Sequence, residues 1–153
     1  MACSDEPHVI RLRGPWQFTR RCVEKSDIRE CSVAATGDVR LPVRSGNFVY
    51  SDFRGRVELR RNFNWPEPLS YRESLWIVVQ EAAWPRLSVD LNGQPLGTVE
   101  GFRHLPAAWE ITPRVTAHNE LQLTWNIDAP ATLEKLSWVE VQLEVRLDVG
   151  PQD

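Results

Sequence analysis

Hydrophobic and polar residues alternate along much of this chain, and a period of two residues is typical of half-buried β-strands. The alternation is clearest at residues 139–147, where aliphatic side chains occupy every second position and polar or charged ones the positions between. Residues 56–63 alternate in the same way. On one face of this second segment we expect Val57, Leu59, Arg61 and Phe63. Both segments therefore predict strands with one face on a core.

The chain is organised around residues 75–112. This stretch opens with a compact apolar run, long enough for a strand and too short for a membrane span. Asn92 and Gly93 both tolerate the positive φ that a two-residue hairpin turn demands. We interpret the stretch as a strand-turn-strand meander without a helix. The strands that we expect in it span residues 75–79, 87–91, 95–99 and 107–112.

The rest of the chain predicts further short strands separated by turn-forming residues. Among 153 residues there are 11 Pro and 8 Gly, which suits a chain that turns often. We expect these further strands at residues 9–18, with a bend at Gly14-Pro15, at 39–42 and at 121–125. The pattern predicts an all-β protein, an antiparallel β-sandwich. One domain should span residues 8–148, with loose tails at 1–7 and 149–153.

Charge and composition exclude some classes of function. The formal net charge of −3 argues against nucleic-acid binding, which usually needs a basic face. The first eight residues lack the apolar core of a signal peptide, and no run of residues is long and apolar enough to cross a bilayer. We therefore expect a cytoplasmic protein with neither a nucleic-acid nor a membrane partner.

The cysteines do not suggest a metal site. Cys3, Cys22 and Cys31 form no C-x-x-C pair, and no histidine pair has metal-ligand spacing. Cys22 and Cys31 either pair across a hairpin or remain free thiols, and a reducing compartment favours free thiols. No nucleophile motif or phosphate-binding glycine loop is present. We expect no cofactor and no catalytic residue.

Several segments, in order, resemble the sugar-binding domain of glycoside hydrolase family 2. Residues 53–66 (FRGRVELRRNFNWP) resemble its "Y-x-G-x-x-x-Y-x-R-x-F-x-x-P" segment. Residues 75–101, 109–112 (WEIT), 118–123 (HNELQL) and 12–18 (L-x-G-x-W-x-F) are similar to its other motifs. The resemblance implies a jelly-roll sandwich of the galactose-binding-domain-like type. It does not imply catalysis, because the family's two catalytic carboxylates lie in a separate β/α barrel of about 200 residues or more.

Strand order predicts where a ligand would bind. Alternate loops of an antiparallel sandwich leave at the same end. The loops expected at one end are 43–54, 80–85, 100–106 and 126–134; those expected at the other are 65–74, 92–93 and 113–118. The first end supplies the candidate sugar-binding residues Trp84, Arg103, His104, Asp128 and Asn47. In the resembled family, loops equivalent to 43–54 and 126–134 reach the sugar pocket with Asn or Asp, and Asn47 and Asp128 are the nearest counterparts.

Simpler roles for these residues stay open. Trp84 before Pro85 can plug the end of the sandwich, and His104 can be a surface residue. Arg54, Arg56 and Arg60 with Glu58 suit a solvated strand face. The leading hypothesis is a stand-alone, non-catalytic module that binds carbohydrate. The alternatives are a protein-interaction or structural module that self-associates or binds a partner, and an accessory subunit of a split glycosidase.

Overall fold

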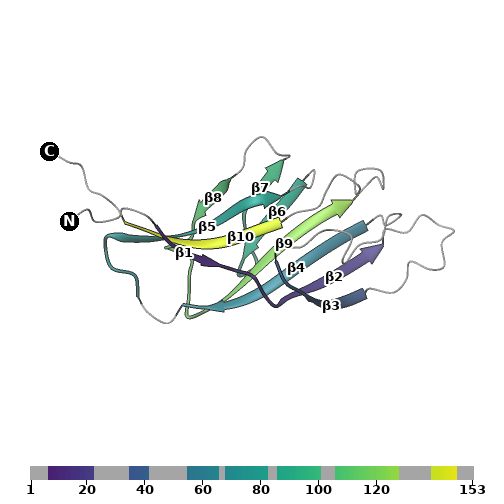
Figure 1. Ribbon diagram of the computed structural model, residues 1–153, viewed down its shortest axis with the longest axis horizontal. Coiled ribbons are helices and arrows are strands. Elements are labelled where there is room, and N and C mark those ends of the chain that lie inside the picture. The colour runs from purple at the N-terminus through teal and green to yellow at the C-terminus, as the bar shows by residue number, and fades with distance from the viewer. Residues whose placement is uncertain are drawn as a thin grey trace.

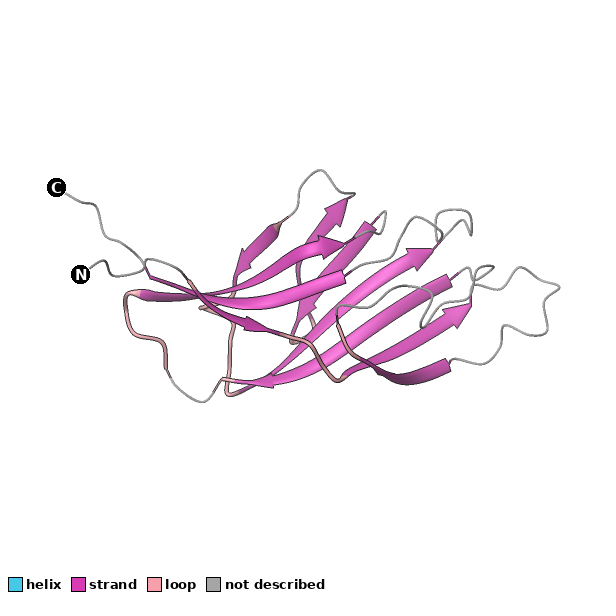
Figure 2. Cartoon of the chain, in the orientation of Figure 1, coloured by secondary structure: helices cyan, strands magenta, loops and turns pink. Residues whose placement is uncertain are grey.

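The molecule is a sandwich of two antiparallel β-sheets (Figure 1). The computed structural model describes residues 7–22, 35–41, 55–65, 68–82, 86–100, 106–127 and 139–147. Within these ranges the chain forms ten strands and no helix (Figure 2). The expected all-β antiparallel sandwich is confirmed.

The larger sheet has six strands in the order β3-β2-β4-β9-β6-β7. Every pair of neighbours in it is antiparallel. Its two long central strands, β4 and β9, pair with each other over ten residues. The strands are β2 (Trp16–Cys22), β3 (Ala35–Val39), β4 (Gly55–Asn64), β6 (Arg86–Leu91), β7 (Gln94–Glu100) and β9 (His118–Ile127).

The smaller sheet has four strands in the order β1-β10-β5-β8. Its central pair joins β5 to β10, the segment with the clearest alternation in the sequence, and β10 has the predicted bounds. The strands are β1 (His8–Arg11), β5 (Glu73–Ala82), β8 (Ala107–Glu110) and β10 (Val139–Leu147).

The predicted first strand, residues 9–18, is two strands in two different sheets. β1 pairs with β10, whereas β2 pairs with β3 and β4. The break lies at Gly14-Pro15. Gly14 has a φ of 149°, which favours glycine, and Pro15 has no N–H to continue a ladder. The bend was predicted, but the passage of the chain from one sheet to the other was not.

The predicted meander at residues 75–112 is wrong in its pairing. Only β6 and β7 form a hairpin, because β5 and β8 lie in the four-stranded sheet and pair with each other there. The chain therefore crosses between the layers before β6 and again after β7. The four strands exist, but β5 and β8 pair with each other and not with the β6–β7 hairpin.

The β6–β7 hairpin turns at Asn92 and Gly93, as the sequence predicts. Both have positive φ, 52° and 79°, which a turn of the type I′ class requires. Asn92 also fixes the turn to β9, since its side-chain Oδ1 accepts a hydrogen bond of 2.8 Å from the Glu120 backbone N–H.

Substituting Gly93 by alanine should isolate the cost of this backbone conformation. An added Cβ would meet nothing within 4 Å, so the expected loss of about 1 kcal/mol in the free energy of unfolding comes from the positive φ alone. Urea denaturation measures it. Gly93→Asn is the control and should lose less, since asparagine tolerates this conformation; equal losses in the two variants would contradict this explanation.

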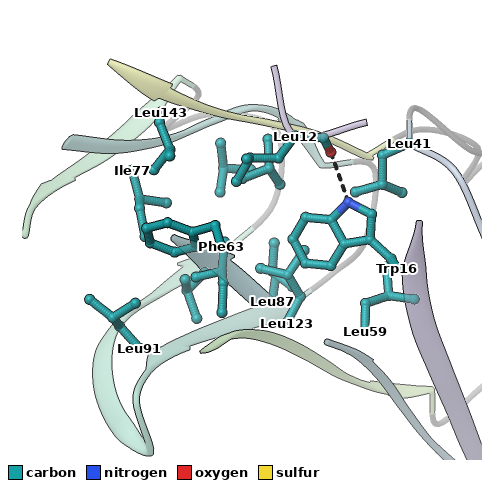
Figure 3. Packing of buried hydrophobic residues seen from close by; sticks show 14 of the residues in the cluster. Leu12, Trp16, Leu41, Leu59, Phe63, Ile77, Leu87, Leu91, Leu123 and Leu143 are labelled. Atoms are coloured by element: carbon teal, nitrogen blue, oxygen red, sulfur yellow. Dashed lines mark hydrogen bonds between the residues drawn. The ribbon is translucent and has the colours of Figure 1, made fainter. Parts of the chain in front are cut away.

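The core lies between the two sheets and takes residues from both. Its largest fully buried side chains are Trp16 and Trp125. Figure 3 shows the Trp16 ring with Leu12, Leu41 and Leu59 around it, and its Nε1 donating a 2.8 Å hydrogen bond to the Leu12 carbonyl oxygen. This bond connects the start of β2 to the segment that crosses from β1, so it holds the crossover against the core.

Candidate functional site

The residues predicted to bind sugar lie outside the described part of the structure. These are Trp84, Arg103, His104, Asp128 and Asn47. Cys3 and Cys31 lie outside it as well, so the question of a bridge to Cys22 stays open. The site at this end of the sandwich remains a prediction from the sequence.

The strand ends that flank these loops do lie together. In the six-stranded sheet the first residue of β4 pairs with the last of β9, and the first of β6 with the last of β7. In the four-stranded sheet the first residue of β10 pairs with the last of β5. The described strand ends therefore agree with the expectation that these loops leave at one end.

Two hollows lie along the other half of β4, and both are lined by Arg61 and Asn62. The first, which we call the interlayer hollow, has a volume of about 350 Å³. Its apolar walls come from three strands and the crossover segment: Ile10, Leu12, Phe63 and Leu143. Arg61 and Trp65 complete it with nitrogen donors. It is a mixed cavity with aliphatic and aromatic walls and two kinds of N–H group.

Strand pairing explains why a hollow forms here. The ladder between β2 and β4 ends at Gln17 and Arg60, but β4 continues beside β9 as far as Asn64. Among the described residues, β4 therefore has no strand neighbour on its β2 side beyond Arg60. The segment before β2 instead crosses to the other sheet at residues 12–15.

Arg61 occupies a position that the alternation of β4 reserves for the core. Its neighbours on that face, Leu59 and Phe63, are buried. The Arg61 Nε and Nη1 atoms are also buried, and neither has a hydrogen-bond partner. Burial lowers the pKa of the Arg61 guanidinium below its usual value, yet an arginine stays protonated at any ordinary pH. Arg61, which lines both hollows, thus carries a positive charge that forms no ion pair with another described residue.

Trp65 continues the same face two residues after Phe63. Its ring packs against the core cluster, and its backbone N–H donates to the Ala117 carbonyl oxygen at 3.0 Å. The indole Nε1 is buried and has no hydrogen-bond partner. Buried indole N–H groups normally find an acceptor. Trp65 therefore lines the interlayer hollow and carries an indole donor without an acceptor.

The second hollow lies on the outer face of the six-stranded sheet and has a volume of about 440 Å³. Its lining is polar, apart from Pro15, and comes from four neighbouring strands: Gln17, Asp38, Arg60, Asn62 and Glu120, beside Arg61. Both charge signs are present, so this hollow can present hydrogen-bond donors and acceptors to a polar ligand. We call it the outer hollow.

Two carboxylates on the outer faces, Glu58 and Glu144, are paired with arginines. Glu58 accepts from Arg56 at 2.9 Å and from Arg60 at 3.3 Å. The two arginine side chains are about half exposed, at 50% and 49%, while the Glu58 side chain is only 10% exposed. The predicted solvated strand face is thus correct for Arg56 and Arg60, and the flanking arginines cover Glu58. Arg54 lies outside the described residues.

The outer face of the four-stranded sheet has a similar network. Glu144 accepts 3.0 Å and 2.9 Å hydrogen bonds from Arg146 and a 2.8 Å bond from the Gln142 amide. The Arg146 guanidinium also lies over the Trp76 ring, 4.3 Å from its centre. Because these groups satisfy one another, the network suits a structural role. Arg61 differs from all of these cations in having no acceptor.

The described residues do not gather metal ligands. No group of three or more His, Cys, Asp or Glu side chains within these ranges is placed to hold a metal ion. Nor does any helix in the described ranges have the length and apolarity to span a membrane.

The sequence carries a signal for the interlayer hollow. Arg61 is a charged residue on the same expected face of residues 56–63 as Val57, Leu59 and Phe63. An inward-facing arginine needs a partner, which makes it a candidate binding residue. Whether a partner exists depends on the strands around it, so the open position became evident only from the fold.

Comparisons with known proteins bear on the fold. No protein-family model matches the chain, and no curated protein is a significant relative in sequence. Solved β-glucuronidases do match in structure. The enzyme from an uncultured Clostridium sp. matches with a TM-score of 0.69 and 16% identity, and 96% of this chain is covered. That of Bifidobacterium dentium, complexed with coumarin-3-O-glucuronide, matches with a TM-score of 0.66, 19% identity and 95% coverage of this chain.

The chain spans 30% of the length of the Clostridium sp. enzyme, 31% of that of the B. dentium enzyme and 29% of that of the β-glucuronidase from Ruminococcus gnavus. The matched part is their sandwich region and does not include the catalytic barrel. The expected likeness to the sugar-binding sandwich of glycoside hydrolase family 2 is confirmed as a likeness of fold.

Proposed function

We propose, from the fold shared with the sandwich region of β-glucuronidases, that this chain is a non-catalytic unit that binds carbohydrate. The observation that carries the proposal is the match of about 95% of the chain to one region of enzymes whose name states that they act on glucuronides. The sequence motifs at residues 53–66 and 75–101 support the same proposal.

The two buried carboxylates of the described residues do not form a catalytic pair with each other. A retaining glycosidase needs two carboxyl groups about 5 Å apart in one cleft, and an inverting one needs them within about 10 Å. Glu58 and Glu144 are the buried acidic residues within the described ranges. They lie on the outer faces of opposite sheets, and stacked sheets are already about 10 Å apart. Each is also held by arginine, so neither is available as a general acid.

We place the carbohydrate at the loop end predicted from the sequence. Trp84 would stack its ring on the C–H face of a pyranose, and Arg103 and Asp128 would bond to neighbouring hydroxyl groups. His104 and Asn47 would add donors and acceptors at the rim. Loops that carry polar and aromatic groups on a rigid sandwich are a common solution for binding sites.

Calorimetric titration with neutral and acidic sugars tests the proposal, and Trp84→Ala tests the site. Loss of a stacking ring should weaken sugar binding by about tenfold or more. Trp76→Ala is the matched control, because Trp76 lies on the outer face of the four-stranded sheet beneath Arg146. Its sugar affinity should equal that of the unmodified chain.

Two outcomes would count against the proposal. If no sugar gives a heat of binding, carbohydrate recognition is excluded, and a protein-interaction or structural role takes its place. If sugar binds but Trp84→Ala and Trp76→Ala both retain full affinity, the function stands and the loop-end site is wrong.

A further inference from the structure

We propose that the interlayer hollow is a binding site for a small carboxylate with an apolar body. The Arg61 guanidinium binds the carboxylate, and the Trp65 indole N–H donates to a second acceptor on the same ligand. This site is separate from the loop-end carbohydrate site and does not depend on it.

The first support is the unpaired charge. Arg61 is half-buried, and its buried Nε and Nη1 atoms have no acceptor, which costs free energy because desolvated donors normally bond to an acceptor. Every other guanidinium in the two described ion-pair networks has a carboxylate within 3.3 Å. A ligand anion would accept hydrogen bonds from Arg61, as the Glu58 and Glu144 carboxylates do from the arginines beside them. The planar fork of a carboxylate also matches the spacing of two guanidinium N–H groups.

The second support is the lining of the interlayer hollow. Among the described residues that line it, Arg61 and Trp65 supply N–H donors, Asn62 and Asn64 supply amides, and none is acidic. The Asn64 Oδ1 is already 2.9 Å from the His118 Nδ1. A negative charge beside Arg61 would therefore have to come from a ligand.

The third support is the shape of the site. Arg61 and Trp65 are four residues apart on one extended face, so their Cα atoms lie about 13 Å from one another. Phe63 lies between them, and Ile10, Leu12 and Leu143 form the remaining wall. A volume of about 350 Å³ is at the lower end of the range for small-molecule sites. A ligand with a charged end, an apolar middle and a second acceptor fits this order of groups.

These walls favour a carboxylate over phosphate or sulfate. A compact oxyanion carries more acceptor positions than Arg61 and Trp65 can satisfy, and it would leave the apolar wall without a partner. A carboxylate on a sugar and a carboxylate on an aryl or alkyl chain have the same anionic group, so both are tested.

The experiment compares pairs of probes that differ in charge alone. Phenyl β-D-glucuronide is titrated against phenyl β-D-glucoside, and 3-phenylpropionate against 3-phenylpropionamide, by calorimetry on the whole chain. At least one acid should bind saturably and about 100-fold more tightly than its neutral counterpart. Preference for the first acid identifies a sugar acid as the ligand class, and preference for the second identifies an aryl or alkyl acid.

Variants locate the binding. Arg61→Met should abolish the preference for the acid without lowering the thermal midpoint of the unliganded chain, because it removes two buried donors that have no acceptor. Arg56→Met is the matched control: Arg56 lies on the same strand, faces outward to Glu58 and lines neither hollow. It should bind the acid as the unmodified chain does. Trp65→Phe keeps an aromatic wall, removes the donor and should weaken binding several-fold.

A spectroscopic measurement keeps the test independent of these variants. The indole N–H resonance of Trp65, assigned by its disappearance in Trp65→Phe, should shift when the acid binds. The proposal is overturned if neither acid binds better than its neutral counterpart, or if Arg61→Met retains the preference. Loop-end carbohydrate binding is judged separately by Trp84→Ala, so either proposal can fail while the other stands.

Discussion

Replacing Trp16 by alanine should lower the free energy of unfolding by about 4 kcal/mol, the largest effect that we expect from a single substitution. Trp16 is fully buried, and removal of a buried tryptophan costs about 3–5 kcal/mol in lost transfer energy and cavity formation. The substitution also leaves the Leu12 carbonyl oxygen without its 2.8 Å hydrogen bond. Urea denaturation followed by far-ultraviolet circular dichroism measures the change.

Trp16→Phe separates the two contributions. The ring is largely kept and the N–H is lost, so the expected loss is about 1–3 kcal/mol. Trp76→Ala is the control for tryptophan removal as such, because Trp76 is only half-buried and lies on an outer face; it should cost less than Trp16→Phe. A loss below about 1 kcal/mol for Trp16→Ala would show that the crossover from β1 to β2 does not depend on this ring.

Replacing Asn119 by alanine should cost about 3 kcal/mol, although it removes no apolar surface. Asn119 is 3% exposed and connects three parts of the chain. Its Oδ1 accepts from the Thr116 N–H at 2.8 Å and from the Asn92 side chain at 3.1 Å. Its Nδ2 donates to the Thr116 carbonyl at 2.7 Å and to the Phe63 carbonyl at 3.4 Å. Each buried group left without a partner costs about 1–3 kcal/mol.

Glu120→Ala is the matched control for Asn119. Glu120 is the next residue on β9, its side chain is exposed, and its backbone N–H bonds to Asn92 whatever its side chain. Its substitution should change the free energy of unfolding by less than about 0.5 kcal/mol. Similar values for the two variants in chemical denaturation would refute the claim that the Asn119 amide connects the hairpin, the turn before β9 and the end of β4.

Much of the strand content could be predicted from the sequence. The bounds of β10 match the prediction, and Leu59 and Phe63 are buried on the predicted face of β4. The Asn92-Gly93 turn has the predicted positive φ values. These features depend on neighbours within a few residues, and the burial pattern of a strand follows its own side chains.

The candidate sites were less accessible to sequence reasoning. The loop-end residues were chosen by type and by strand order, and they lie outside the described ranges, so they stay predictions. Arg61 was placed on the correct face, but its missing partner was not foreseen. Arg61 lacks a partner because the ladder between β2 and β4 ends at Arg60. The alternation of side chains along a strand does not predict where its ladder ends.

By itself, the sequence determined that this protein is built of short strands, that Leu59 and Phe63 lie on a buried face of β4, and where the tightest hairpin turns. Only the tertiary structure decided that β1 and β2 belong to different sheets, that β5 and β8 are neighbours, and that the Arg61 guanidinium forms no ion pair with another described residue. The physical reason is the range of the interactions. Burial patterns and turn geometry depend on adjacent residues, whereas strand pairing depends on hydrogen bonds and packing between segments that are distant in the chain.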